Sequence, residues 1–426
     1  MRLRTGLVGL VAFVLAVSVS CTADKPARST ATPAATTTVD HSDHAAEPAA
    51  KSPPAPLPLQ FEQLLGQHAF VTVQLMRGMV SAEPEARQAA GSALQANTEA
   101  LSQLVGSRYG TAAGDRFKQL WQRRIADLSL YADSVSNGDA AGKKTAQDAL
   151  MSDSSNYGSW LAGASKNHVK PTDATAAARQ HVQALMKQID AYHVKDYAQA
   201  YTTERQLYEQ VFSSGAVLAK GSVDAKAAAA FDAPTEKLRE AFAMLLGEHM
   251  AMLVETQRAT FSGSQEFQAA STQVNANTDA IAKAMETIVG AKAAAEFKSA
   301  WGDHIDGLVS YTAAVAGNDE SKKSAAEKEL NQVAVDLAVY FSHVVKNQAA
   351  VVPLTSAITG HDRHLMDHVD AFAERDFGAA QQMELDGYDQ MLGISNTLVD
   401  AIQRVVKPGL PVGGSQTGGG GTAPRR

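Results

Sequence analysis

Several features that identify common classes of protein are scarce or missing in this sequence. Its 426 residues include a single cysteine, so no intramolecular disulfide can form. The formal net charge is −7 and no long basic run occurs, which argues against nucleic-acid binding, because that needs clustered lysine and arginine. Beyond the N-terminal region no segment holds the run of about 18 apolar residues that a further membrane-spanning helix would need.

Sequence motifs of common enzymes are also missing. The chain contains no HExxH, no GxSxG, no P-loop and no glycine-rich dinucleotide turn. The Glu-x-x-His pattern of di-iron helical bundles does not occur on its apolar stripes. We therefore expect no catalytic residues and a protein that is not an enzyme.

The first twenty residues have the pattern of an export signal. Arg2 and Arg4 supply a positive start, and residues 7–19 supply an apolar stretch that is too short for a stable membrane span. Residues 17–21, Val-Ser-Val-Ser-Cys, resemble the lipobox of bacterial lipoproteins, with serine at position 18 where leucine is commoner. The resemblance implies a signal peptide over 1–20 and a lipid on Cys21 that anchors the chain to a bacterial cell membrane, outside the cytoplasm. The alternative is an ordinary secretory signal with a chance cysteine.

Composition divides the remaining chain into folded and unfolded parts. Residues 21–57 are rich in Ala, Thr, Ser and Pro, and such a stretch buries too little apolar surface to fold, so we expect a disordered tether. The glycine-rich residues 409–426 are expected to form a disordered tail. Between them we expect two helical repeats, 58–220 and 235–408, joined by a linker over 221–234.

An internal duplication is the strongest signal of organisation. With a shift of 180 residues, Phe117 coincides with Phe297, and Trp121 coincides with Trp301. The same shift superimposes identical residues as far as Tyr208 and Tyr388. Upstream, Leu-Leu-Gly-x-His at 64–68 matches Leu-Leu-Gly-x-His at 245–249, one residue out of step.

Each copy has the pattern of a set of helices. Good helix formers dominate, and apolar residues recur at spacings of three and four. The short links between helices favour antiparallel neighbours. The sequence predicts an all-α fold of two tandem antiparallel bundles of about six helices each, with first-copy helices near 61–80, 85–107, 111–136, 140–163, 173–193 and 195–219.

Polar side chains interrupt the apolar stripes in both copies. The second copy places there His249, His304, His361, Glu384 and Tyr388. The first copy has at the matching positions His68, Arg124, His181, Glu204 and Tyr208. Because an unsatisfied inward-facing polar group costs about 1–3 kcal/mol, we expect each set of five to form one shared cluster.

Two interpretations of these clusters remain open. In the first, His249, His304, His361 and Glu384 bind a transition metal ion, since imidazole and carboxylate suit copper, zinc or iron. In the second, both sets are buried hydrogen-bond networks, with Glu204 paired to Arg124. A guanidinium cannot bind a cation, so the first-copy set is expected to be structural. Two further histidines beside His361, at positions 364 and 368, are expected to be solvated.

Two stretches carry a resemblance to a group of known proteins. Leu-Leu-Gly-Glu-His at 245–249 and Trp-Gly-Asp-His-Ile at 301–305, with the helix of His361, resemble helical repeats of exported bacterial proteins, some of which carry the name copper amine oxidase-like. The resemblance covers about 61–220 and 240–406. It implies an extracytoplasmic helical repeat of poorly defined function. The word oxidase does not carry over to this chain, because nothing in it resembles the catalytic core of that enzyme class, including its tyrosine-derived cofactor motif.

Together these patterns predict a membrane-anchored binding or scaffold lipoprotein. One hypothesis is that it binds a transition metal in the second copy. The other is that it is an interaction module that presents helix faces to another protein of the cell envelope.

Overall fold

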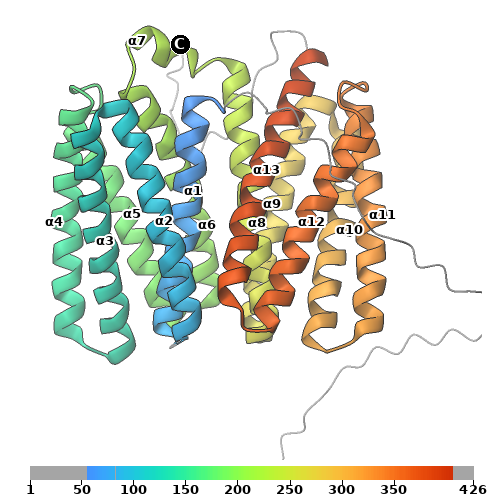
Figure 1. Ribbon diagram of the computed structural model, residues 1–426, viewed down its shortest axis with the longest axis horizontal. Helices are drawn as coiled ribbons and strands as arrows, with labels where there is room; N and C mark the ends of the chain where they lie inside the picture. The colour runs from blue at the N-terminus through green and yellow to red at the C-terminus, as the bar shows by residue number, and fades with distance from the viewer. Residues whose placement is uncertain (1–54, 82, 406–426) are drawn as a thin grey trace, which may run out of the picture. The chain divides into compact units, whose positions relative to one another are not determined.

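The described part of the chain is entirely helical. A computed structural model describes residues 55–81 and 83–405, so the predicted signal peptide, Cys21, most of the tether and the glycine-rich tail lie outside it. Within these ranges the chain forms thirteen α-helices and no strand, which confirms the predicted all-α fold (Figure 1). None of these helices combines the length and the apolar character that crossing a membrane would need.

Each predicted repeat contains six long helices. The first repeat (58–220) is formed by α1 (Leu57–Val80), α2 (Pro84–Tyr109), α3 (Thr111–Asn137), α4 (Ala140–Ala164), α5 (Pro171–His193) and α6 (Tyr197–Gly221). The second repeat (235–408) is formed by α8 (Pro234–Ser262), α9 (Ser264–Val289), α10 (Ala291–Ala316), α11 (Glu320–Val344), α12 (Val351–Ala373) and α13 (Phe377–Val405). The predicted linker contains a short helix, α7 (Ala225–Ala230).

Local sequence explains where several of these helices begin. Proline occupies the first turn of α2, α5 and α8, where its missing N–H costs no hydrogen bond. The carboxylate of Asp139 accepts hydrogen bonds from the backbone at the start of α4, and Asp319 caps α11 in the same way. Equivalent caps at equivalent positions support the duplication.

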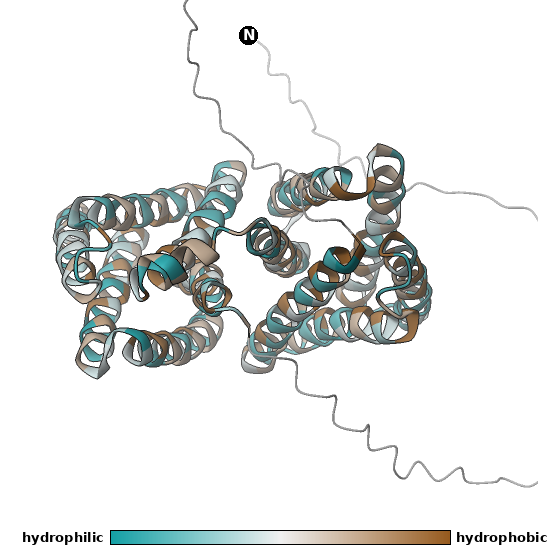
Figure 2. Ribbon diagram, turned by 90° about the horizontal axis from the view of Figure 1, so that it is seen from above, coloured by the Kyte–Doolittle hydropathy of each residue, from teal (hydrophilic) through white to brown (hydrophobic). Residues whose placement is uncertain are grey.

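The first helix of each repeat forms the centre of its bundle. Helix α1 contacts α2, α3, α5 and α6, and α8 contacts α9, α10, α12 and α13 in the same pattern. Seen end-on in Figure 2, each helix carries polar and apolar residues around its circumference. Because α1 and α8 are surrounded on most sides, their polar side chains are buried as well as their apolar ones.

The two repeats contact each other reciprocally. Helix α6 packs on α9 and α13 packs on α2, while α1 lies against α8 between these pairs. The hydroxyls of Tyr208 and Tyr388, which are equivalent residues, are hydrogen-bonded at 2.8 Å. A Cβ atom at Gly66 would overlap the Tyr388 hydroxyl, and one at Gly247 would overlap the Tyr208 hydroxyl. The glycine of the repeated Leu-Leu-Gly sequence thus makes room for a tyrosine of the other repeat.

Candidate metal centre in the second repeat

Three of the four predicted ligands lie together in the core of the second repeat. His249 comes from α8, His304 from α10 and His361 from α12. Their ring centroids are 5.7–5.9 Å apart, and one nitrogen from each ring lies within 4.8 Å of the others. Each side chain is at most 2% exposed. Among the described residues, no other group of histidines, cysteines and carboxylates is arranged in this way.

The three imidazoles form no hydrogen bonds with the described part of the chain through any of their six ring nitrogens. Burial lowers the pKa of His304 to about 4. Burial, followed by the neighbouring histidines, lowers the pKa values of His249 and His361 well below the usual range. Free imidazole nitrogens are therefore present at neutral pH, in the state that binds metal ions.

A carboxyl group that the sequence analysis missed lies beside these histidines. Oδ1 of Asp362 is 3.2 Å from Nδ1 of His304, although the contact lacks the geometry of a hydrogen bond. Asp362 is 2% exposed, and burial raises its pKa well above the usual range. The first repeat has Val182 at the equivalent position. The second repeat thus has an acid in place of an apolar residue directly after a candidate ligand. This difference between the copies was the sequence signal that could have identified Asp362.

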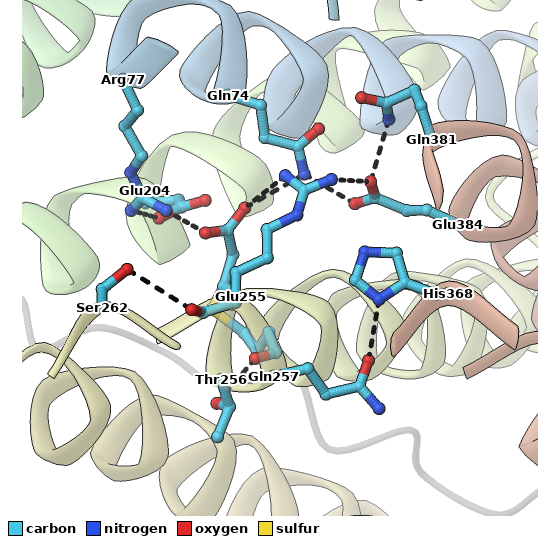
Figure 3. Close-up of polar contacts among 12 residues, drawn as sticks. Gln74, Arg77, Glu204, Glu255, Thr256, Gln257, Ser262, His368, Gln381 and Glu384 are labelled. Carbon is cyan, nitrogen blue, oxygen red and sulfur yellow. Dashed lines mark hydrogen bonds and ion pairs between the residues drawn. The ribbon is translucent and has the colours of Figure 1, made fainter. Parts of the chain in front are cut away.

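The fourth predicted ligand, Glu384, is not brought together with the histidines. It lies on α13 and accepts hydrogen bonds from Gln74 at 2.7 Å, from Gln381 at 2.9 Å and from Arg258 at 3.0 Å (Figure 3). Tyr388 is also elsewhere, at the contact with Tyr208. The prediction of one shared cluster of five groups in each copy was wrong, because the last helix turns its polar side chains towards the other repeat.

Glu384 belongs to an ionic network between the repeats. Arg77 of α1 forms ion pairs with both Glu204 and Glu255, and Gln74 donates to Glu255 at 3.0 Å (Figure 3). The prediction that Glu204 pairs with Arg124 was therefore wrong. Burial raises the pKa of Glu204 to about 8 and that of Glu384 to about 7. The network satisfies most of its buried charge internally, which makes it a structural connection between the repeats.

The two additional histidines of α12 have different environments. His368 is fully buried, and its Nδ1 lies 3.1 Å from Oε1 of Gln257. The prediction that it is solvated was wrong, because α8 covers this side of α12. His364 is half-buried, and neither residue joins the cluster of His249, His304 and His361.

The equivalent position in the first repeat has different chemistry. His68 and His181 keep the same spacing, with ring centroids 5.9 Å apart. Nδ1 of His68 accepts a hydrogen bond from the indole of Trp121 at 3.1 Å, and its Nε2 lies 3.5 Å from the hydroxyl of Thr72. The guanidinium of Arg124 lies over the ring of Trp121. The first repeat thus replaces the third imidazole with a fixed positive charge.

Comparison with known proteins returned nothing: no family model, no curated protein and no solved structure matches the chain. The resemblance to exported helical-repeat proteins therefore stays a prediction.

Proposed function

We propose that this protein is a membrane-anchored extracytoplasmic binding lipoprotein that holds one transition metal ion at His249, His304 and His361. The observation that carries the proposal is the convergence of three buried, neutral imidazoles whose nitrogens have no hydrogen-bond partner among the described residues. Lipid attachment at Cys21 would tether this binding domain to the membrane.

A metal ion accounts for the cluster better than a structural network does. A network satisfies its members, and each buried group without a partner costs about 1–3 kcal/mol. In the first repeat His68 has two neighbours that meet this need, whereas both nitrogens of His249 and the indole nitrogen of Trp301 have none. The second repeat retains these costs in its folded core, and coordination would satisfy one nitrogen of each of the three histidines.

The geometry allows coordination after a small contraction. Metal–imidazole bonds are about 2.0–2.1 Å long, which places the nitrogens of a tetrahedral site about 3.3 Å apart. Nitrogens that already lie within 4.8 Å need only modest shifts of the rings. Asp362 would orient the ring of His304 through Nδ1, leaving Nε2 for the metal, as carboxylates do behind many metal-binding histidines. A donor set of imidazoles suits copper, zinc or iron.

Elemental analysis of the purified protein tests the proposal. We expect about one equivalent of metal in the wild type and none in His249→Ala or His361→Ala. The matched controls are His181→Ala, the equivalent of His361, and Glu384→Gln, and both should keep the metal. Circular dichroism would confirm that each variant is folded. Equal metal content in folded His361→Ala and wild-type protein would refute the site.

The alternative is an interaction module of the cell envelope in which the histidines are structural. A metal-free wild type, together with a lower melting temperature for His361→Ala, would favour that alternative.

A further inference from the structure

Arg124 is a buried cation without a partner. Its side chain is in the core of the first repeat and the residue is 3% exposed. Its guanidinium lies over the rings of Trp121 and Tyr157, at 4.7 and 5.1 Å from their centroids, and forms no hydrogen bond or ion pair with a described residue. The carboxylate of Asp153 is paired instead with Arg123, at 3.7 Å. Aromatic faces compensate only part of the cost of burying such a charge.

A cavity of about 170 Å³ adjoins this guanidinium. Its walls are mainly apolar and include Leu65, Leu161, Val211 and Leu218. The other buried polar side chain that lines it is His181, whose two ring nitrogens have no hydrogen-bond partner among the described residues. The cavity is similar in size to one that holds a benzene molecule.

The chemistry of this cavity defines the class of its ligand. Guanidinium groups bind carboxylates through two parallel hydrogen bonds, and a desolvated arginine without a partner is suited to that interaction. The neutral ring of His181 can donate one further N–H to the same carboxylate. The apolar walls favour a compact hydrocarbon body over a highly hydrated anion such as phosphate, and the exposed carboxylate of Asp173 at the edge also disfavours multiple negative charges.

We infer that the first repeat binds a small organic monocarboxylate in this cavity, with Arg124 holding the carboxylate and the apolar walls enclosing the body of the ligand. This inference is independent of the metal centre, because it uses residues of the other repeat. The two halves of the duplication would then bind ligands of opposite charge.

Calorimetric titration of the full chain with benzoate tests the inference. Benzyl alcohol, which has a similar size and no charge, is the matched probe. We expect benzoate to bind the wild type and to bind Arg124→Leu at least about tenfold more weakly, as follows from losing hydrogen bonds to a charged group. Ala178→Leu should also abolish binding, because it fills the cavity and leaves Arg124 in place. Arg123→Leu, which removes the exposed neighbouring arginine that does not line the cavity, should bind benzoate like the wild type.

Three results would overturn the inference: no benzoate binding by the wild type, equal affinity in Arg124→Leu, or benzyl alcohol binding as tightly as benzoate. Arg124→Leu should remain folded, because it replaces an unpaired buried charge with an apolar side chain. That variant therefore decides the question even if Ala178→Leu does not fold.

Discussion

The two repeats use the same helices to build cores of different chemistry. In both, the first, third and fifth helices each direct one polar residue to the bundle centre. The second repeat supplies three histidines, whereas the first supplies two histidines and Arg124. A group that can bind a cation in one copy is replaced by a cation in the other, so the centres of the two bundles have opposite chemical character.

The neighbours of these groups differ in a consistent way. Where Thr72 lies beside His68, the second repeat has Leu253, and His249 has no hydrogen-bond partner there. Where Tyr157 lies under Arg124, the second repeat has Leu337. Asp362 lies 3.2 Å from His304, but Val182 stands at that position in the first repeat. The residues that surround Arg124 in the first repeat and His304 in the second therefore differ together with the central residue itself.

The largest expected effect is the conversion of the first core into a copy of the second. The triple variant Thr72→Leu, Arg124→His, Val182→Asp would place a third imidazole, a neighbouring carboxyl and a His68 with a free Nε2 in the first repeat. We expect the metal content to rise from about one to about two equivalents, measured by elemental analysis. The variant with Arg124→His alone is the control and should bind the second ion more weakly. A triple variant that folds and still holds one equivalent would show that the repeats differ in more than these positions.

The fold could be predicted from sequence because its signals are local or repeated. Helical periodicity depends on neighbouring residues, and the match of Trp121 with Trp301 requires only counting. The capping residues Asp139 and Asp319 are likewise 180 residues apart. The short helix Ala225–Ala230 was missed, because a region read as a link between copies carries no repeat to compare it with.

For the candidate site, the sequence predicts which face of its own helix each side chain occupies. His249, His304 and His361 were identified because each lies on an apolar stripe. Glu384 lies on such a stripe too, but its stripe is buried against the other repeat, where it meets Gln74. Sequence periodicity shows that a side chain is buried and does not show which helix buries it. The separation of one expected cluster into a group of three histidines and an interface network depends on that missing information.

A smaller effect distinguishes the two arginines of the interface, Arg77 and its equivalent Arg258. Arg77 pairs with Glu204 and Glu255, and its loss would leave Glu204 without any hydrogen bond to a described residue. Arg258 is more exposed, and Glu384 would keep two hydrogen bonds without it. We expect Arg77→Met to lower the free energy of unfolding by about 3–5 kcal/mol and Arg258→Met by about 1–2 kcal/mol. Urea unfolding measures both, and equal losses would contradict the asymmetry of the network.

The smallest effect concerns Glu62, a buried acid in α1 whose equivalent in the second repeat is Ala243. Burial, and to a lesser degree the carboxylate of Glu240, raises the pKa of Glu62 from 4.5 to about 8. The folded protein therefore keeps a proton on Glu62 that the unfolded chain loses above about pH 4.5. The contribution of Glu62 to the free energy of unfolding thus falls as the pH rises from about 4.5 to about 8, and it stays constant above that pH. Glu62→Gln removes this dependence and leaves the other buried carboxyls unchanged. Urea unfolding at pH 6 and at pH 7 measures the free energy of unfolding of both proteins. From pH 6 to pH 7, the wild type should lose about 1 kcal/mol of this free energy relative to the variant. A constant difference between the two proteins would mean that Glu62 is already ionised in the fold, and that the first repeat tolerates a buried charge where the second has only a methyl group.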